Sequence, residues 1–405
     1  MEVGDGFDEK KGSPNGWPNS VRPFFSEVAQ WKREVIARGI DVIDLGIGSP
    51  DRGPSERVRR ALSEAAADPT LYGYPGTEGT LAFRQTVAAW YDYRFGVKLD
   101  PETEVVALMG SQDGLSHLAL AVTDPGDVAI VPDPGYPIYA ASLVIAGVTP
   151  YLVPLCAEHD FLPQLDRIPA DVLKQAKFIL LNYPSNPLSA VATLPFFERL
   201  VDFARQHDLL IVHDIAYSEM AFDGFRPPSV LEVEGAKDVA VEFHSLSKSF
   251  NMAGCRIAFM VGQPEAVRAL RTLKSNIDYG VFLAVQRAGI EAMREDMEPG
   301  SVSVAALYQR RRDIVVEGLN AAGWAIPKPK ASMFIWAPIP HGWTSRQISR
   351  EMLYTAGVVV IPGDAFGKEG EGYVRIALVQ EEDRLLEAVR RIGEFLRVIG
   401  KKSGL

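Results

Sequence analysis

Short apolar runs alternate with amphipathic stretches through the middle of the chain. Apolar runs of strand length occupy residues 104–109, 127–135, 177–184, 209–214, 239–245 and 255–262. Between them, helical spacing of apolar positions predicts helices, for example over residues 80–96, 113–123 and 194–208. Continuous apolar strands that alternate with helices are typical of a mostly parallel sheet buried on both faces. The pattern therefore predicts an α/β fold.

The pattern changes after about residue 290. A long helix is predicted over residues 303–323, followed by strands at 332–339, 358–363 and 373–378 and by helices at 345–357 and 382–399. We expect residues 289–405 to form a smaller α+β domain beside a large cofactor-binding domain of residues 49–288. Residues 21–48 are expected to form an arm that packs with the small domain. The polar residues 1–20, rich in Gly, Asn and Pro, are expected to be a flexible tail.

Composition excludes several classes of protein. The 405 residues are 47% hydrophobic, which is enough for a sizeable core. A net charge of −10, with no basic block, argues against nucleic acid and anionic membranes as partners. The two distant cysteines, Cys156 and Cys255, fit a reducing cytoplasm, and we find neither a signal peptide nor a run long enough to span a bilayer. The six histidines are scattered and predict no metal site.

Polar residues gather where the predicted strands end, which is the edge at which open α/β sheets bind ligands. Gly110, Ser111 and Gln112 stand between a strand and a helix, where backbone N–H groups suit a phosphate. Taken alone, this segment favours a helix capped by Ser111. Asp214 ends the strand at 209–214, where a carboxylate either caps the next helix or holds a protonated ring nitrogen.

Four further residues lie in segments whose local pattern does not by itself indicate a functional role. Asn182 and Asn186 lie among prolines, and this spacing alone indicates a turn. Arg375 lies within the strand at 373–378, where it either faces solvent or meets a buried anion. Lys248 lies between hydroxyl residues shortly before an apolar strand, so it is either a solvated turn residue or a reactive amine.

One glycine pair is a decoy. Gly46 and Gly48 follow a strand and resemble the start of a dinucleotide-binding fingerprint. Pro50 and Asp51 stand where the helix and the third glycine belong, so a nicotinamide enzyme is not supported.

Taken in chain order, these segments resemble the class I aminotransferases of the fold-type I pyridoxal-phosphate (PLP) superfamily. The segments are GSQD, PDPGYP, NYPSNP, HDIAY, SLSKSF and VRIAL. The resemblance extends from about residue 22 to about residue 398. It is closest to the branch that holds LL-diaminopimelate aminotransferases and related alanine transaminases, through LGIGSPD, HSLSKSFNMAG and KSNIDYGVF.

The resemblance implies catalytic roles around the ring of PLP. Lys248 is expected to bind PLP covalently and to act as the general base, which requires an unprotonated amine. Asp214 is expected to keep the pyridine nitrogen protonated, so that the ring serves as an electron sink. Tyr217 and Asn186 are expected to hydrogen-bond the phenolic oxygen, and Tyr136 to stack on the ring.

The resemblance also implies a phosphate site that two subunits share. The backbone amides of Ser111 and Gln112, the Ser245 hydroxyl and Arg256 are expected to hold the phosphate. Tyr74 is expected to reach the phosphate of the neighbouring subunit, which implies a homodimer.

For the substrate, the resemblance implies that Arg375 grips the α-carboxylate near the backbone of Gly48, with Asn186 beside it. The implied reaction moves an amino group from an L-amino acid to a 2-oxo acid with ping-pong kinetics, glutamate and 2-oxoglutarate being the expected pair. LL-diaminopimelate is the favoured substrate. The alternative is a transaminase that acts on alanine or on a broad range of amino acids. An aspartate transaminase or a PLP-dependent lyase is less expected.

The chain also departs from the family pattern. Gln112 and Asp113 stand where diaminopimelate-type relatives usually have Lys and Glu, and Leu188 and Ser189 replace a Thr-Gly pair. Glu78 is displaced by one position from the acidic residue of the diaminopimelate enzymes. Aspartate aminotransferases use an arginine in the stretch that matches residues 275–285 to bind the second carboxylate. This stretch contains no arginine here, so an aspartate transaminase is less expected. A transcription regulator with an aminotransferase-like domain is not expected, because only about twenty residues, of acidic character, precede the predicted fold.

Overall fold

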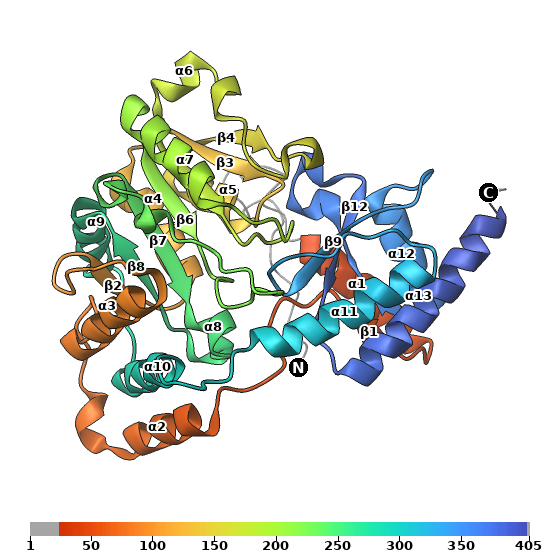
Figure 1. Cartoon of the computed structure of the whole chain (residues 1–405), viewed down its shortest axis with the longest axis horizontal. Helices are drawn as coiled ribbons and strands as arrows, with labels where there is room; N and C mark the ends of the chain where they lie inside the picture. The colour runs from red at the N-terminus through yellow and green to blue at the C-terminus, as the bar shows by residue number, and fades with distance from the viewer. Residues whose placement is uncertain (1–23, 403–405) are drawn as a thin grey trace, which may run out of the picture.

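A seven-stranded sheet forms the centre of the larger part of the molecule (Figure 1). The computed structural model describes residues 24–402, so the tail expected over residues 1–20 lies outside the described residues. The strand order is β2-β8-β7-β6-β5-β3-β4, and only β8 runs antiparallel to its neighbours. The strands are β2 (Val105–Leu108), β3 (Val128–Asp133), β4 (Thr149–Pro154), β5 (Ala176–Asn182), β6 (Leu210–Asp214), β7 (Ala240–Ser245) and β8 (Ala258–Gly262).

The predicted α/β class is confirmed, because each of the six apolar runs forms a strand of this sheet. The strand β4 was missed. It lies at the edge of the sheet, and only one of its six residues is buried. An edge strand therefore lacks the continuous apolar run that marks the central strands.

Helices cover both faces of the sheet and make three layers (Figure 1). On one face, apolar side chains of α4, α5 and α9 pack against alternate strand residues such as Val131 and Val212. On the other face, α3, α7 and α10 pack against the intervening residues, such as Ile130 and Ile211. The helices of this part are α2 (Glu56–Ala67), α3 (Leu81–Phe95), α4 (Ser111–Val122), α5 (Ile138–Ala146), α6 (Ala170–Leu173), α7 (Leu194–His207), α8 (Leu246–Ser249), α9 (Pro264–Lys274) and α10 (Leu283–Asp296).

The smaller part contains a three-stranded antiparallel sheet of order β11-β12-β9. The apolar run at 358–363, which we predicted as one strand, divides between this sheet and a second pair, in which β10 runs parallel to β1. The elements are α1 (Phe24–Ala37), β1 (Ile43–Asp44), α11 (Ala305–Ala321), β9 (Phe334–Pro338), α12 (Ser345–Ala356), β10 (Val358–Val359), β11 (Ile361–Pro362), β12 (Tyr373–Ala377) and α13 (Glu382–Lys402). The pairing of β1 with β10 attaches the segment after α1 to this part.

The expected domain boundary at residues 288–289 falls inside α10, a continuous helix that packs against α2 and α3 of the large part. We propose instead that the second unit begins after α10, in the segment that leads to α11. None of the helices within residues 24–402 is long and apolar enough to cross a membrane.

Candidate active site

A cavity of about 770 Å³ opens at the carboxyl ends of the central strands, where the large sheet faces the small one. The adjacent parallel strands β5, β6 and β7 end at Asn182, Asp214 and Ser245, and the last two of these residues line the cavity. The cavity is lined by every residue that we expected in the site except Tyr74. The set comprises Gly48, Ser111, Gln112, Tyr136, Asn186, Asp214, Tyr217, Ser245, Lys248, Arg256 and Arg375.

The start of α4 has the geometry of an anion site. Gly110 is the N-cap of this helix, its φ is +93°, and no side chain caps the helix. The interpretation of Ser111 as a side-chain cap is therefore wrong, and the first N–H groups of the helix line the cavity without it. A Cβ atom on Gly110 would lie 2.3 Å from Nη2 of Arg256, so only glycine lets this guanidinium approach the loop.

Lys248 lies in α8, directly after the end of β7, and its ammonium donates to the carbonyl oxygen of Gly48. Burial, together with the nearby cations Arg375 and Arg256, lowers the pKa of Lys248 from 10.5 to about 8, and Asp214 opposes this shift. A lysine in this setting supplies an unprotonated amine close to neutral pH. The interpretation as a solvated turn residue does not fit a group that burial perturbs so strongly.

Asp214 is buried at the end of β6. Its Oδ2 accepts a hydrogen bond of 2.8 Å from the Tyr139 hydroxyl, and its Oδ1 accepts one of 3.2 Å from the Ala216 N–H. Burial raises the pKa of Asp214, and these two donors oppose the rise. No helix follows this carboxylate directly, so it is not a helix cap, and it lines the cavity.

Tyr139 is a site residue that sequence reasoning missed. It lies in the first turn of α5, three residues after Tyr136, and the two rings meet edge to face at 5.9 Å. Tyr136 in turn donates a long hydrogen bond of 3.4 Å to Gln112. The spacing of the two tyrosines at a helix start was the available signal, because positions three apart share a helix face.

Arg375 is only 2% exposed, which excludes the interpretation as a solvent-facing strand residue. Its Nη1 donates to Oδ1 of Asn186 at 2.9 Å and its Nη2 donates to the carbonyl oxygen of Gly46 at 2.8 Å, whereas its Nε has no partner. The guanidinium also lies over the rings of Phe334 and Phe366. A buried guanidinium that meets only neutral acceptors among the described residues is suited to an anionic ligand.

The side chains of Asn182 and Asn186 make different contacts near Arg375. Asn186 hydrogen-bonds Tyr217 as well as Arg375, so it joins the two functional groups that we expected it to serve. Asn182 instead supports the backbone, since its side chain donates to the carbonyl oxygen of Asp214 and accepts from the Asn186 N–H. Gly46 supplies the carbonyl oxygen that Arg375 binds, and Gly48 lines the same cavity.

Tyr74 is the one expected site residue that lies outside the cavity. Its side chain is 87% exposed and packs against Tyr279, with the ring centroids 4.8 Å apart. Beside it, Tyr72 packs against Phe282 at 5.3 Å. We call these four exposed rings the aromatic patch.

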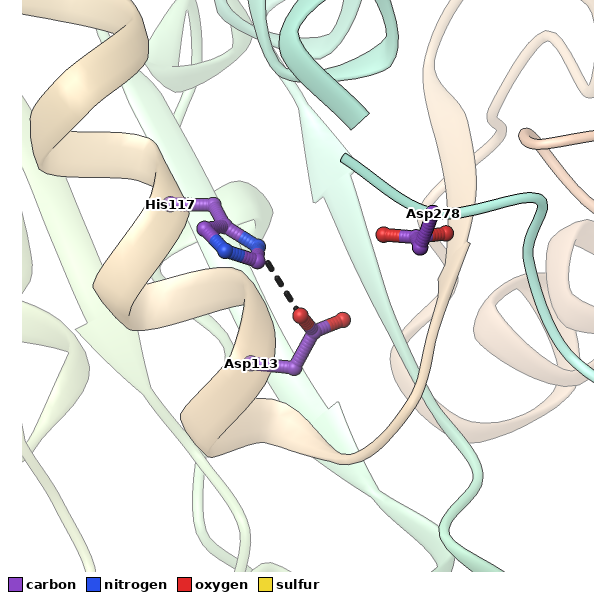
Figure 2. A group of neighbouring side chains, drawn as sticks. All are labelled: Asp113, His117 and Asp278. Atoms are coloured by element: carbon purple, nitrogen blue, oxygen red, sulfur yellow. Dashed lines mark ion pairs between the residues drawn. The ribbon is translucent and has the colours of Figure 1, made fainter. Parts of the chain in front are cut away.

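Figure 2 shows a second polar group near the start of α4: Asp113, His117 and Asp278. Although the scattered histidines predicted no metal site, one of them has a carboxylate neighbour: His117 Nδ1 lies 2.9 Å from Asp113 Oδ1, one helical turn away. The ammonium of Lys274 lies 2.9 Å from Asp113 Oδ2 and 2.8 Å from Asp278 Oδ2. A metal ion there would have to displace this buried cation, so the two carboxylates already share one ammonium and do not form an open metal site.

The fold and the cavity define an enzyme that brings a buried lysine amine to a ligand held by an anion-binding helix start and a buried arginine. A family model described as aminotransferase class I and II matches residues 40–392. The chain belongs to this family of PLP-dependent aminotransferases.

Known relatives support the same assignment. The chain is 48% identical over 377 residues to the LL-diaminopimelate aminotransferase of Moorella thermoacetica, covering 93% of this chain and 96% of the relative. Among solved structures, substrate-bound BacF from Bacillus subtilis matches with a TM-score of 0.87 and 37% identity, over 94% of this chain and 98% of that one. A probable N-succinyldiaminopimelate aminotransferase from Thermus thermophilus matches with a TM-score of 0.85 and 40% identity, over 91% and 99%. The expected resemblance and the transaminase activity are thus confirmed.

Proposed function

We propose that this enzyme binds PLP in the cavity and transfers the amino group of LL-diaminopimelate to 2-oxoglutarate. The observation that carries the cofactor assignment is the convergence of Lys248, Asp214 and the uncapped start of α4 on one cavity. When bound, PLP supplies an electron sink for the bonds at the substrate Cα. All other steps rest on groups of the chain.

The residues fit the cofactor from end to end. The N–H groups at the start of α4, the Ser245 hydroxyl and Arg256 would hold the phosphate. Asp214, supported by Tyr139, would accept a hydrogen bond from the protonated ring nitrogen. Tyr136 would cover the ring, and Tyr217 and Asn186 would bind its phenolic oxygen.

Amino transfer also requires a group that binds the substrate carboxylate and a group that moves the Cα proton. Arg375 would bind the α-carboxylate through the guanidinium edge that contains its unpartnered Nε, with Asn186 and the backbone of residues 46–48 beside it. Lys248 would take the Cα proton and return it to the cofactor side, because its lowered pKa makes the neutral amine easier to form than in an exposed lysine.

A charged pair in the same cavity supports LL-diaminopimelate as the substrate. Lys32 of α1 and Asp44 of β1 both line the cavity, and their side chains form an ion pair of 2.7 Å. A substrate that carries an ammonium and a carboxylate at its distal end finds a partner for each group in such a pair. The identity of 48% to an LL-diaminopimelate aminotransferase points the same way. Alanine has no distal charge and is the second candidate.

We further propose a homodimer in which the aromatic patch contacts the second copy and Tyr74 reaches the partner's phosphate site. Four large aromatic rings that lie together on the surface expose apolar area to water, which is typical of a protein–protein interface.

Two free cysteines, Cys156 and Cys255, support a cytoplasmic location for the dimer. Light scattering on the wild type and on Tyr279→Ser tests the homodimer. We expect the wild type to be a dimer and Tyr279→Ser to have a larger monomer fraction. A monomeric wild type would contradict the proposal.

The experiment that tests the function combines spectroscopy with turnover. We expect wild type with PLP to show a near-visible absorption band that Lys248→Ala lacks. With 2-oxoglutarate as acceptor, glutamate formation should be faster from LL-diaminopimelate than from alanine by at least about 100-fold in kcat/KM.

The outcomes separate the candidates. Glutamate formation from alanine alone would replace LL-diaminopimelate by the alanine alternative. A lysine-dependent band with no amino transfer from any amino acid would favour a lyase. Absence of the band from wild type would overturn the role of Lys248.

A further inference from the structure

A buried ammonium lies directly behind the proposed phosphate site. Lys274, at the end of α9, is 0% exposed and forms ion pairs with Asp113 of α4 and with Asp278, at 2.9 and 2.8 Å. Its two partners belong to segments 165 residues apart in sequence, and Figure 2 shows the carboxylates facing one another. None of the three residues lines the cavity, so they do not touch a ligand bound there.

The carboxylate of Asp113 holds the loop that starts α4. Its Oδ2 accepts a hydrogen bond of 3.1 Å from the N–H of Met109, the residue before Gly110. An uncompensated carboxylate in this first helical turn would repel a phosphate dianion bound to the same helix start. Lys274 offsets the charge of Asp113, and because the ammonium is buried the interaction is stronger than it would be in water.

The carboxylate of Asp278 holds the segment that carries the aromatic patch. Its Oδ1 accepts a hydrogen bond of 2.7 Å from the N–H of Gly280, whose φ is +84°. A Cβ atom on Gly280 would lie 2.7 Å from the carbonyl oxygen of Gly76, so this segment lies tightly against the loop that bears Tyr74. One ammonium therefore fixes both the phosphate loop and the segment beneath Tyr74.

We propose that Lys274 is a positioning residue for the phosphate end of the cofactor: it neutralises Asp113 behind the helix start and ties that loop to the segment of the aromatic patch. The proposal rests on the proposed function, because it takes the start of α4 as the phosphate site.

The test compares PLP with pyridoxal, which lacks the phosphate, by absorption titration of the apoenzyme. Lys274→Met should raise the Kd for PLP by at least about tenfold and leave that for pyridoxal within about twofold. The double variant Asp113→Asn/Lys274→Met removes the carboxylate as well and should recover most of the loss, a non-additivity that a merely structural role does not produce. Arg268→Met, on the same helix, is the control and should bind PLP like wild type.

Asp113→Asn alone covers the case in which Lys274→Met does not fold, because asparagine keeps the shape of the side chain and an acceptor for Met109. This variant should bind PLP at least as tightly as wild type, and weaker PLP binding would overturn the proposal. Equal losses for PLP and pyridoxal in Lys274→Met, or no recovery in the double variant, would also overturn it. A wild type that binds neither compound would instead contradict the proposed function.

Discussion

At the residue scale, the site is built from groups that are costly to bury. Lys248 and Arg375 both have pKa values lowered by burial, to about 8 and about 10, and they lie near each other in one cavity. Arg375 meets only neutral oxygens among the described residues, and Lys248 makes its hydrogen bond to a backbone carbonyl. Burying these two cations lowers the stability of the folded protein without ligand. A bound anionic ligand would offset that cost by pairing with them.

Replacing Lys248 by methionine should stabilise the apoenzyme at pH 7 by about 2 kcal/mol, since a pKa lowered from 10.5 to about 8 marks a buried cation that folding disfavours. The folded state loses its proton at lower pH than the unfolded state, so this penalty is complete below pH 8 and fades as pH rises toward 10.5. Urea unfolding at pH 7 and pH 10 measures it. An equal gain at both pH values would contradict the electrostatic cause.

Arg375→Gln should raise KM for the amino acid substrate by about 100-fold or more while PLP binding stays near wild type, because the buried guanidinium lines the cavity and is the proposed partner of the substrate carboxylate. Steady-state kinetics and PLP titration measure the two effects. Arg384→Gln, which breaks an exposed ion pair with Asp41, is the matched control and should leave KM unchanged. Loss of PLP binding in Arg375→Gln would place this residue at the cofactor instead.

At the element scale, strand ends and helix starts do the positioning. The parallel strands β5, β6 and β7 deliver their last residues to one edge, and α4 presents an uncapped N-terminus to the same cavity. The loop before α4 reaches this geometry through Gly110, where a φ of +93° favours glycine and where a Cβ atom would displace the guanidinium of Arg256.

Gly110→Ala should therefore weaken PLP binding by about tenfold or more and destabilise the protein by about 1–3 kcal/mol, through strain at φ +93° and displacement of Arg256. PLP titration and thermal unfolding measure the two effects. Gly53→Ala, at a position where a Cβ meets nothing within 4 Å, should leave PLP binding unchanged. Wild-type affinity in Gly110→Ala would show that the loop is not a phosphate site.

At the scale of the whole molecule, the site depends on how the two parts are held together. Arg311 of α11 is buried and forms two hydrogen bonds of 2.7 Å to Asp51, which follows the loop of residues 46–48 in the cavity wall. Burial tends to raise the pKa of Asp51, but the hydrogen bonds and charge of Arg311 bring it below its usual value. This pair ties the long helix of the small part to the cavity wall.

Asp51→Asn should lower the free energy of unfolding by about 2 kcal/mol at pH 7, because it leaves a buried guanidinium without its anion. The lowered pKa means that the pair contributes above the usual carboxyl pKa and that its contribution is lost as pH falls through the lowered value. Urea unfolding at pH 7 and pH 3 should show the difference shrinking in acid. Glu381→Gln, in an exposed pair with Arg52, should change stability by less than about 0.5 kcal/mol.

The sequence by itself determined six of the seven strands of the large sheet, the family and eleven of the residues that line the cavity, because local periodicity reports burial and the motifs stand at strand ends. It did not reveal β4, whose edge position removes the apolar run, or Tyr139, whose partner Asp214 is 75 residues away. It left open whether Ser111 caps a helix and whether Arg375 faces solvent. Only the tertiary structure decided these points and placed Lys274 between Asp113 and Asp278. The partner of a buried charge is set by packing between distant segments, which no local pattern encodes.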